Sequence, residues 1–76
     1  MYLFDVMVAG NGRVMHRDVD ALYKAIDLAR DLAQEHGTIH VMRNGWWRGS
    51  WVPGGGLGGK GFWANSPDVH HKDAGG

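Results

Sequence analysis

The dipeptide Asn44-Gly45 lies between two runs of strand-forming residues, 38–43 and 46–52. Both of its residues tolerate the positive φ angles of a type I′ turn, and such a dipeptide between such runs is the strongest short-range signal of a β-hairpin. The turn therefore predicts two adjacent antiparallel strands and sets their register. Any fold for this chain has to contain this hairpin.

A two-residue turn determines which side chains lie side by side on each face of the hairpin. One face is expected to carry Arg43 with Trp46, Val41 with Arg48 and Ile39 with Ser50. The other face is expected to carry Met42 with Trp47, Thr38 with Trp51 and His40 near Gly49. Both faces thus hold large apolar side chains, and one helix can cover only one of them.

The segment before this hairpin predicts one amphipathic helix that runs to about His36. Apolar side chains recur at spacings of three and four: Leu22, Ala25, Ile26, Ala29, Leu32 and Ala33. We expect Asp18 or Asp20 to cap the first turn, because a short acidic side chain accepts hydrogen bonds from free backbone amides. Gly37 is expected to end the helix in a left-handed conformation.

The first part of the chain predicts a second hairpin. Residues 2–9 are rich in aromatic and β-branched side chains, with Tyr2, Phe4, Val6 and Val8 on one face. The glycine-rich turn 10–12 should return the chain as a strand over residues 13–17. The whole order predicts an α+β fold of ββαββ type: a four-stranded antiparallel sheet with one helix on one face and a Gly-rich C-terminal extension.

A chain of 76 residues without cysteine supports one domain, stabilised by packing or by a partner. We expect this domain to cover residues 1–63, including a Gly/Trp-rich segment at 53–63, and residues 64–76 to form a disordered tail. No apolar run approaches the ~18 residues of a membrane span. The first nine residues also lack the basic start of a signal peptide, so the sequence predicts a cytoplasmic protein without a membrane segment.

The motifs that carry chemistry are weak in this sequence. Gly54, Gly59 and Lys60 have the spacing of a phosphate-binding loop, but Gly61 stands where that loop needs a hydroxyl. Gly37 interrupts the spacing between His36 and His40, and the remaining histidines form no ligand set. We therefore expect no catalytic residues, no cofactor and no metal site, and we interpret the chain as a protein that is not an enzyme.

The second half of the chain instead predicts a binding surface. From residue 37 to residue 63 there are three bases and no acid, interleaved with aromatic side chains. The candidate partner-binding residues are Arg43, Trp46, Trp47, Arg48, Trp51, Lys60, Phe62 and Trp63. Tryptophan and arginine dominate protein interfaces, and the same side chains stack bases in single-strand binders. The alternative role of these tryptophans, above all Trp47 and Trp51, is to form the core.

Two resemblances bear on function. The run Ala25, Ile26, Ala29, Arg30, Ala33 and Gly37 before a strand is similar to small bacterial ββαβ domains. In size and composition the chain resembles accessory proteins of bacteriophages and mobile elements, including anti-CRISPR inhibitors, which block a larger machine by occupying its surface. The ββαββ order with terminal Gly75-Gly76 also resembles ubiquitin-like carriers that are activated at a C-terminal diglycine.

These features together predict a non-enzymatic binding protein that inhibits or modulates a protein or ribonucleoprotein complex. A homodimer through the face that the helix leaves open is also expected. The alternatives are a single-stranded nucleic-acid-binding module and, as a minor one, a ubiquitin-like carrier. A net charge of zero argues against strong nucleic-acid binding, because that affinity comes mainly from phosphate contacts.

Overall fold

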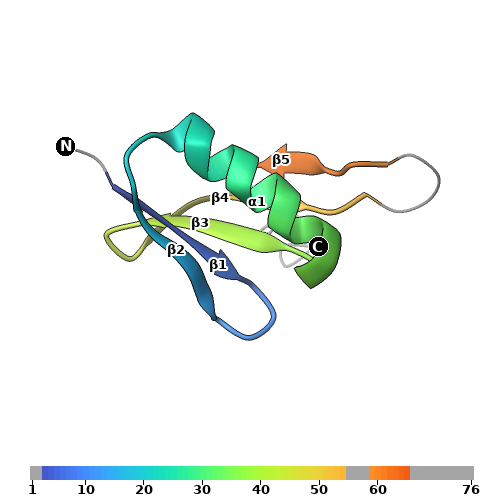
Figure 1. The fold of residues 1–76 in the computed structure, drawn as a ribbon, viewed down its shortest axis with the longest axis horizontal. Coiled ribbons are helices and arrows are strands. Elements are labelled where there is room, and N and C mark those ends of the chain that lie inside the picture. The colour runs from blue at the N-terminus through green and yellow to red at the C-terminus, as the bar shows by residue number, and fades with distance from the viewer. Residues whose placement is uncertain (1–2, 55–58, 66–76) are drawn as a thin grey trace, which may run out of the picture.

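The computed structural model describes residues 3–54 and 59–65, and these form an α+β fold with one helix across one face of an antiparallel sheet (Figure 1). The elements are β1 Phe4–Val8, β2 Val14–Val19, α1 Leu22–His36, β3 Ile39–Arg43, β4 Trp46–Val52 and β5 Phe62–Ala64. The strand order is β2-β1-β3-β4-β5. The predicted class, the single helix and the antiparallel pairing are confirmed, and the predicted number of four strands is wrong.

The fifth strand is formed by the last two residues of the predicted Gly/Trp-rich segment, 53–63, and by Ala64. Phe62 pairs with Val52, Trp63 with Trp51 and Ala64 with Ser50. Strand β5 extends one residue past the predicted domain boundary, so Ala64, the first residue of the predicted tail 64–76, belongs to the sheet. Residues 66–76 of that tail lie outside the described residues, as does part of the Gly-rich segment, 55–58. Three residues are too few to show a strand periodicity, which explains why the sequence pattern did not reveal β5.

The helix begins without the predicted cap. Its N-cap residue is Ala21, which makes no side-chain hydrogen bond to the first turn. Asp20 instead binds Lys24, with 2.9 Å between Oδ1 and Nζ, and Asp18 lies in β2 with a positive φ of 58°. At the other end Gly37 has the predicted positive φ, 80°, but its ψ of −153° takes the chain directly into an extended direction instead of a left-handed turn.

The Asn44-Gly45 turn is confirmed, with φ angles of 51° and 81°. The register beyond it is not the predicted one. Met42 still pairs with Trp47, but Val41 pairs with Gly49, so Arg48 is an extra residue on β4. A β-bulge of this kind moves every later residue to the opposite face.

Because of the bulge, the side chains of β4 change faces. Ile39 lies opposite Trp51, and His40 lies opposite Ser50. The predicted pairs of Ile39 with Ser50 and Thr38 with Trp51 are therefore wrong. Trp51 joins Ile39 on the face that α1 covers.

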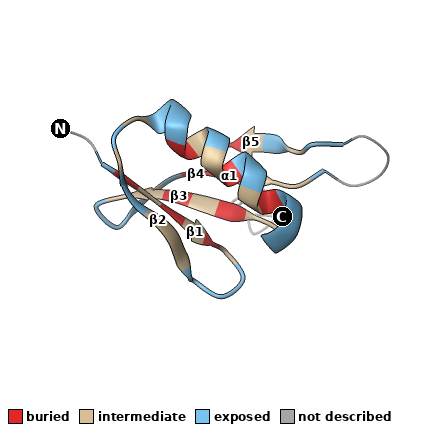
Figure 2. Ribbon diagram, viewed as in Figure 1, coloured by how far each residue is buried: buried red, intermediate tan, exposed pale blue. Residues whose placement is uncertain are grey.

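The core lies between α1 and the sheet, and the helix contributes alanine to it. Its buried side chains are Ala25, Ala29 and Ala33, which share one stripe of the helix. They pack on alternate residues of the two central strands: Phe4, Val6, Val8, Ile39 and Val41. Small side chains let the helix lie close to the sheet, and the larger Leu28 and Leu32 are partly buried against the same core. Figure 2 shows the buried positions of α1 on its side toward the sheet.

A glycine on β4 makes room for a tryptophan on β5. The bulge places Gly49 opposite Val41, on the helix-covered face. A Cβ atom at Gly49 would lie far inside van der Waals contact of the Trp63 ring carbons. The indole of Trp63 therefore lies directly on the backbone of Gly49, and it packs against the core from there.

The Gly49→Ala variant should therefore be less stable than the wild-type protein. In an ordinary strand position this change relieves the entropic cost of glycine and stabilises by roughly 0.5–1 kcal/mol. Here the added methyl group has to displace Trp63, and overpacking of this kind costs about 1–3 kcal/mol. Thermal unfolding should show a melting temperature lower by several degrees.

The control for this variant is Gly10→Ala, because no atom lies within 4 Å of the Cβ position at Gly10. This control should melt within about a degree or two of the wild type, as surface changes usually do. An unchanged or higher melting temperature for Gly49→Ala would contradict the contact between Gly49 and Trp63.

Candidate functional site

The eight predicted binding residues do not form one surface. The fold distributes them over the core, the sheet face opposite α1, the tip of the β3–β4 hairpin and the side of α1. The physical cause of the division is the bulge at Arg48, because it changes the direction of every side chain after it on β4.

Trp51 and Trp63 belong to the helix-covered face. They pair with each other across β4 and β5, and both are partly buried against the core. The indole nitrogen of Trp51 donates a hydrogen bond of 2.8 Å to the carbonyl oxygen of Lys60, which ties the start of β5 to β4. These two tryptophans therefore pack against the core, which is the role that the sequence left open as the alternative to partner binding.

Lys60 is separated from the other predicted cations. Together with Arg30, Asp31 and Gln34 of α1 it lines a hollow of about 450 Å³ on the helix side of the molecule. Asp31 and Arg30 give this hollow charges of both signs. Lys60 therefore does not add to a basic surface with Arg43 and Arg48.

Trp47 lies on the sheet face that α1 does not cover, which we call the open face. Its indole nitrogen donates a hydrogen bond of 2.7 Å to the hydroxyl oxygen of Ser50, and the same oxygen lies 2.5 Å from Nδ1 of His40. Ser50 is only 1% exposed. A serine beside a histidine can form a nucleophilic pair. This hydroxyl, however, is shielded from solvent and already accepts a hydrogen bond from Trp47, so we interpret it as a structural acceptor.

The sequence did not predict this polar cluster, because the expected register put Ser50 and His40 on opposite faces. Gly49 was the one hint in the sequence, because a glycine inside a strand often marks a β-bulge. The cluster satisfies the polar atoms of a buried serine and fixes the indole of Trp47 on the open face.

Arg43, Trp46 and Arg48 come together at the hairpin tip. With Asn44 they line a hollow of about 300 Å³, and we call these four residues the hairpin-tip surface. Arg43 pairs with Trp46 across the turn. Trp46 is 75% exposed, the highest value among the exposed large apolar side chains of the described residues.

The two charged residues that line the hairpin-tip surface, Arg43 and Arg48, have the same sign. The described residues after α1, 37–54 and 59–65, include no aspartate or glutamate. The surface thus combines an exposed indole with two guanidinium groups on a rigid two-residue turn. Its chemistry fits a partner that offers an apolar contact next to carboxylates or phosphates.

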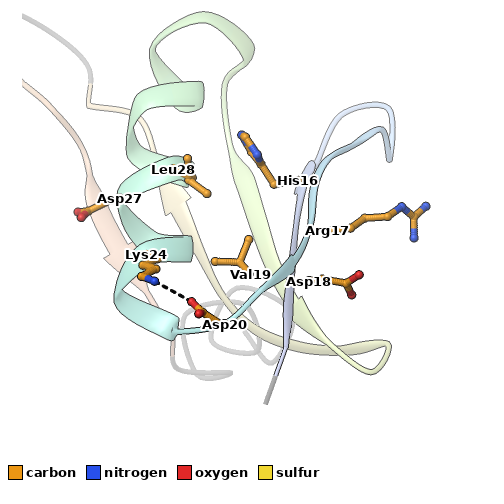
Figure 3. A pocket seen from close by; sticks show the side chains of 8 residues that line it. All are labelled: His16, Arg17, Asp18, Val19, Asp20, Lys24, Asp27 and Leu28. Carbon is orange, nitrogen blue, oxygen red and sulfur yellow. Dashed lines mark hydrogen bonds and ion pairs between the residues drawn. The ribbon is translucent and has the colours of Figure 1, made fainter. Parts of the chain in front are cut away.

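Another hollow of the described residues was not predicted at all. It is a groove of about 580 Å³ between β2 and α1, lined by His16, Arg17, Asp18, Val19, Asp20, Lys24, Asp27 and Leu28 (Figure 3). Figure 3 shows Val19 and Leu28 on its two walls and the Asp20–Lys24 ion pair at one end. It exists because α1 lies mainly over the three strands β1, β3 and β4 and makes few contacts with β2.

The charges of this groove largely compensate one another. The hydrogen bond and the charge of Lys24 lower the pKa of the Asp20 carboxyl below its usual value, and Asp20 in turn raises the pKa of Lys24. Asp27 pairs with Arg30 at 3.4 Å. The groove therefore shows no preference for a charged ligand, and its apolar walls are small.

Neither edge of the sheet is a good template for another strand. On β2 the register with β1 shifts twice, and the amide of Asp18 donates to the Asp5 carboxylate at 3.3 Å instead of extending the ladder. The opposite edge, β5, has three residues. Bulged and very short edges protect a sheet against edge-to-edge pairing, so docking surfaces have to be sought on its faces and turns.

Among residues 3–54 and 59–65, no three His, Cys, Asp or Glu side chains gather in a way that would hold a metal ion. The adjacent His70 and His71 lie outside this part of the chain. The fifteen-residue α1 is neither long nor apolar enough to cross a bilayer, and it is the one helix of the described residues.

In comparisons with known proteins, no family model, no curated protein and no solved structure matched this chain. The fold and the surfaces described above are therefore the basis for assigning a function. They define a small α+β domain with a cationic aromatic hairpin tip and a largely apolar open face.

The hydrogen bond between Trp47 and Ser50 should contribute measurably to stability. Ser50→Ala removes the acceptor of the indole N–H, and loss of a partner at a buried polar group costs about 1–3 kcal/mol. Trp47→Phe removes the donor. Chemical denaturation of both single variants and the double variant should give a coupling free energy of about 1 kcal/mol.

Additive effects of Ser50→Ala and Trp47→Phe would contradict the hydrogen bond. The matched control is a cycle between Ser50→Ala and Tyr23→Phe, because Tyr23 is 67% exposed on α1. That control cycle should show no coupling.

Proposed function

We propose that this chain is a non-enzymatic binding protein that docks on a larger macromolecular complex through the hairpin-tip surface and inhibits or modulates it by occupying its surface. The observation that carries the proposal is Trp46, which is 75% exposed between Arg43 and Arg48. This mode of action is the one that the resemblance to phage accessory proteins implies.

Exposure of a large indole at a rigid position favours a binding role. An indole left in water forgoes the stabilisation of burying its roughly 150–250 Å², whereas the other three tryptophans of this chain are partly buried. A partner that covers Trp46 recovers that stabilisation, and the paired hairpin already fixes the backbone from which the indole projects. Tryptophan and arginine are also the side chains that most often dominate binding energy.

The charge around the tip favours an acidic partner surface. Arg43 and Arg48 lie on the part of the chain that has no acid among its described residues. Guanidinium groups bind carboxylates with two parallel hydrogen bonds, which gives orientation as well as affinity. A protein partner with carboxylates beside an apolar pocket matches both components of the surface.

Single-stranded nucleic acid is the second candidate, and the same lack of acids favours it. Such binders combine several stacking platforms with a charged groove along the backbone. Here Trp51 and Trp63 pack against the core and Lys60 lies beside α1, which leaves one indole and two cations at the tip. So few contacts support weak, salt-sensitive binding. The ubiquitin-like alternative depends on Gly75-Gly76, which lie outside the described residues.

Site-specific photocrosslinking in the native source tests the proposal. A Trp46→benzoylphenylalanine variant keeps an aromatic group at the tip and should form a discrete protein adduct. Adding Arg48→Glu to this variant should reduce the yield strongly, because truncation of hot-spot residues costs at least about 2 kcal/mol. The control is Tyr23→benzoylphenylalanine, which is similarly exposed on α1 and should give no such adduct.

Equal adducts from positions 46 and 23, or a yield that Arg48→Glu leaves unchanged, would contradict a docking role for the hairpin tip. An adduct that nuclease removes and protease does not would replace the protein partner by a nucleic acid.

A further inference from the structure

The open face carries apolar side chains across the whole sheet. The pairing of the strands places Val14 beside Met7, Met42 beside Trp47 and Val52 beside Phe62. All of them are half-buried except Phe62, which is 53% exposed. The helix covers the other side of the sheet, where the alternate residues of the same strands form the core (Figures 1 and 2).

We infer that this open face packs against the open face of a second copy of the chain, which forms a symmetric dimer with the two helices outside. This interface is separate from the hairpin-tip surface, and it would stand whether or not the tip binds a partner. The occupant is argued from the charge of the face, the charge of the whole chain and the area available.

The face is poor in charge. On the central strands β1 and β3, the ionisable side chains of this face are Asp5 and His40, which lie in neighbouring rows next to Met42 and Met7. The Asp5 carboxylate already accepts the amide of Asp18, and His40 contacts the Ser50 hydroxyl. A strongly charged partner would lose hydration here without gaining ion pairs, whereas a second apolar, charge-poor face matches it.

The same apolar face on a second copy meets this requirement by symmetry, because a twofold axis places one patch against itself. The chain has a formal net charge of zero, so two copies approach without long-range repulsion. Two sheets that meet in this way pack about 10 Å apart, as in a β-sandwich. Both sheet edges are bulged or short, so the face is the part of the sheet where association fits.

The area sets the strength of this dimer. Five strands about 4.8 Å apart, each with about five residues of 3.3 Å, give a face of roughly 24 by 17 Å, or about 400 Å² per copy. The total of about 800 Å² lies below the ~1,200 Å² of stable standard interfaces. The dimer should therefore be weak and should form as the protein concentration rises through the micromolar range.

Sedimentation velocity of the full chain over a concentration series tests this inference. The wild-type protein should shift from monomer at low micromolar to dimer at high micromolar concentration, and added sodium chloride should not reverse the shift. Phe62→Glu and Met42→Glu should remain monomeric over the same range. Tyr23→Glu on α1 and Trp46→Ala at the hairpin tip should dimerise as the wild type does.

A wild-type protein that stays monomeric at every concentration would overturn the inference, as would a dimer that Phe62→Glu leaves intact or that salt dissociates. Circular dichroism verifies that each variant is folded. Phe62 is more than half exposed, so its substitution keeps the test decisive even if Met42→Glu unfolds the chain. The Trp46→Ala result separates this test from that of the hairpin tip.

Discussion

The extra residue at Arg48 on β4 is the constraint on which the arrangement of this molecule depends. Without it, Gly49 and Trp51 would point away from α1, and Trp63 would have no glycine surface to lie on. With it, Trp51 and Trp63 pack against the core, and Ser50 moves to the opposite face beside His40. The bulge thus decides which tryptophans stabilise the fold and which remain available for contacts.

The alanine stripe of α1 is the second constraint, and it complements the first. Because Ala25, Ala29 and Ala33 let the helix approach closely, the two central strands supply the large core side chains. The helix is narrow compared with a five-stranded sheet, so it leaves a groove along β2 on its own side and an entire apolar face on the other. The available surfaces follow from a small domain that has one helix to cover a wide sheet.

Sequence patterns predicted the parts of the fold that local chemistry controls. The helix, the Asn44-Gly45 turn, the bounds of β4 and the grouping of Phe4, Val6 and Val8 on one face of β1 followed from periodicity and turn preferences. The patterns failed where a long-range contact decides: the bulge is stabilised by Trp63, which comes from a strand too short to detect. The predicted helix cap failed for a local reason: Ala21 is the N-cap residue, and Asp20 forms an ion pair with Lys24, four residues further on.

For the candidate site, composition identified the right residue types but not their grouping. Arg43, Trp46 and Arg48 were expected on one face and do line one hollow, whereas Lys60, Trp51 and Trp63 lie elsewhere. Composition does not reveal a register shift of one residue, although such a shift moves every later side chain to the other face. The residue types of the surface could therefore be predicted, but not which of these residues lie together.

Hydrogen exchange of the four indole N–H groups, followed by NMR, tests this division of the tryptophans most directly. Trp47 and Trp51 donate to Ser50 and to the Lys60 carbonyl, so their indole protons should exchange slowly. The indole proton of Trp46, which is 75% exposed, should exchange fast and broaden with a soluble paramagnetic agent. Protection of Trp46 equal to that of Trp47 and Trp51, or fast exchange of those two, would contradict the account.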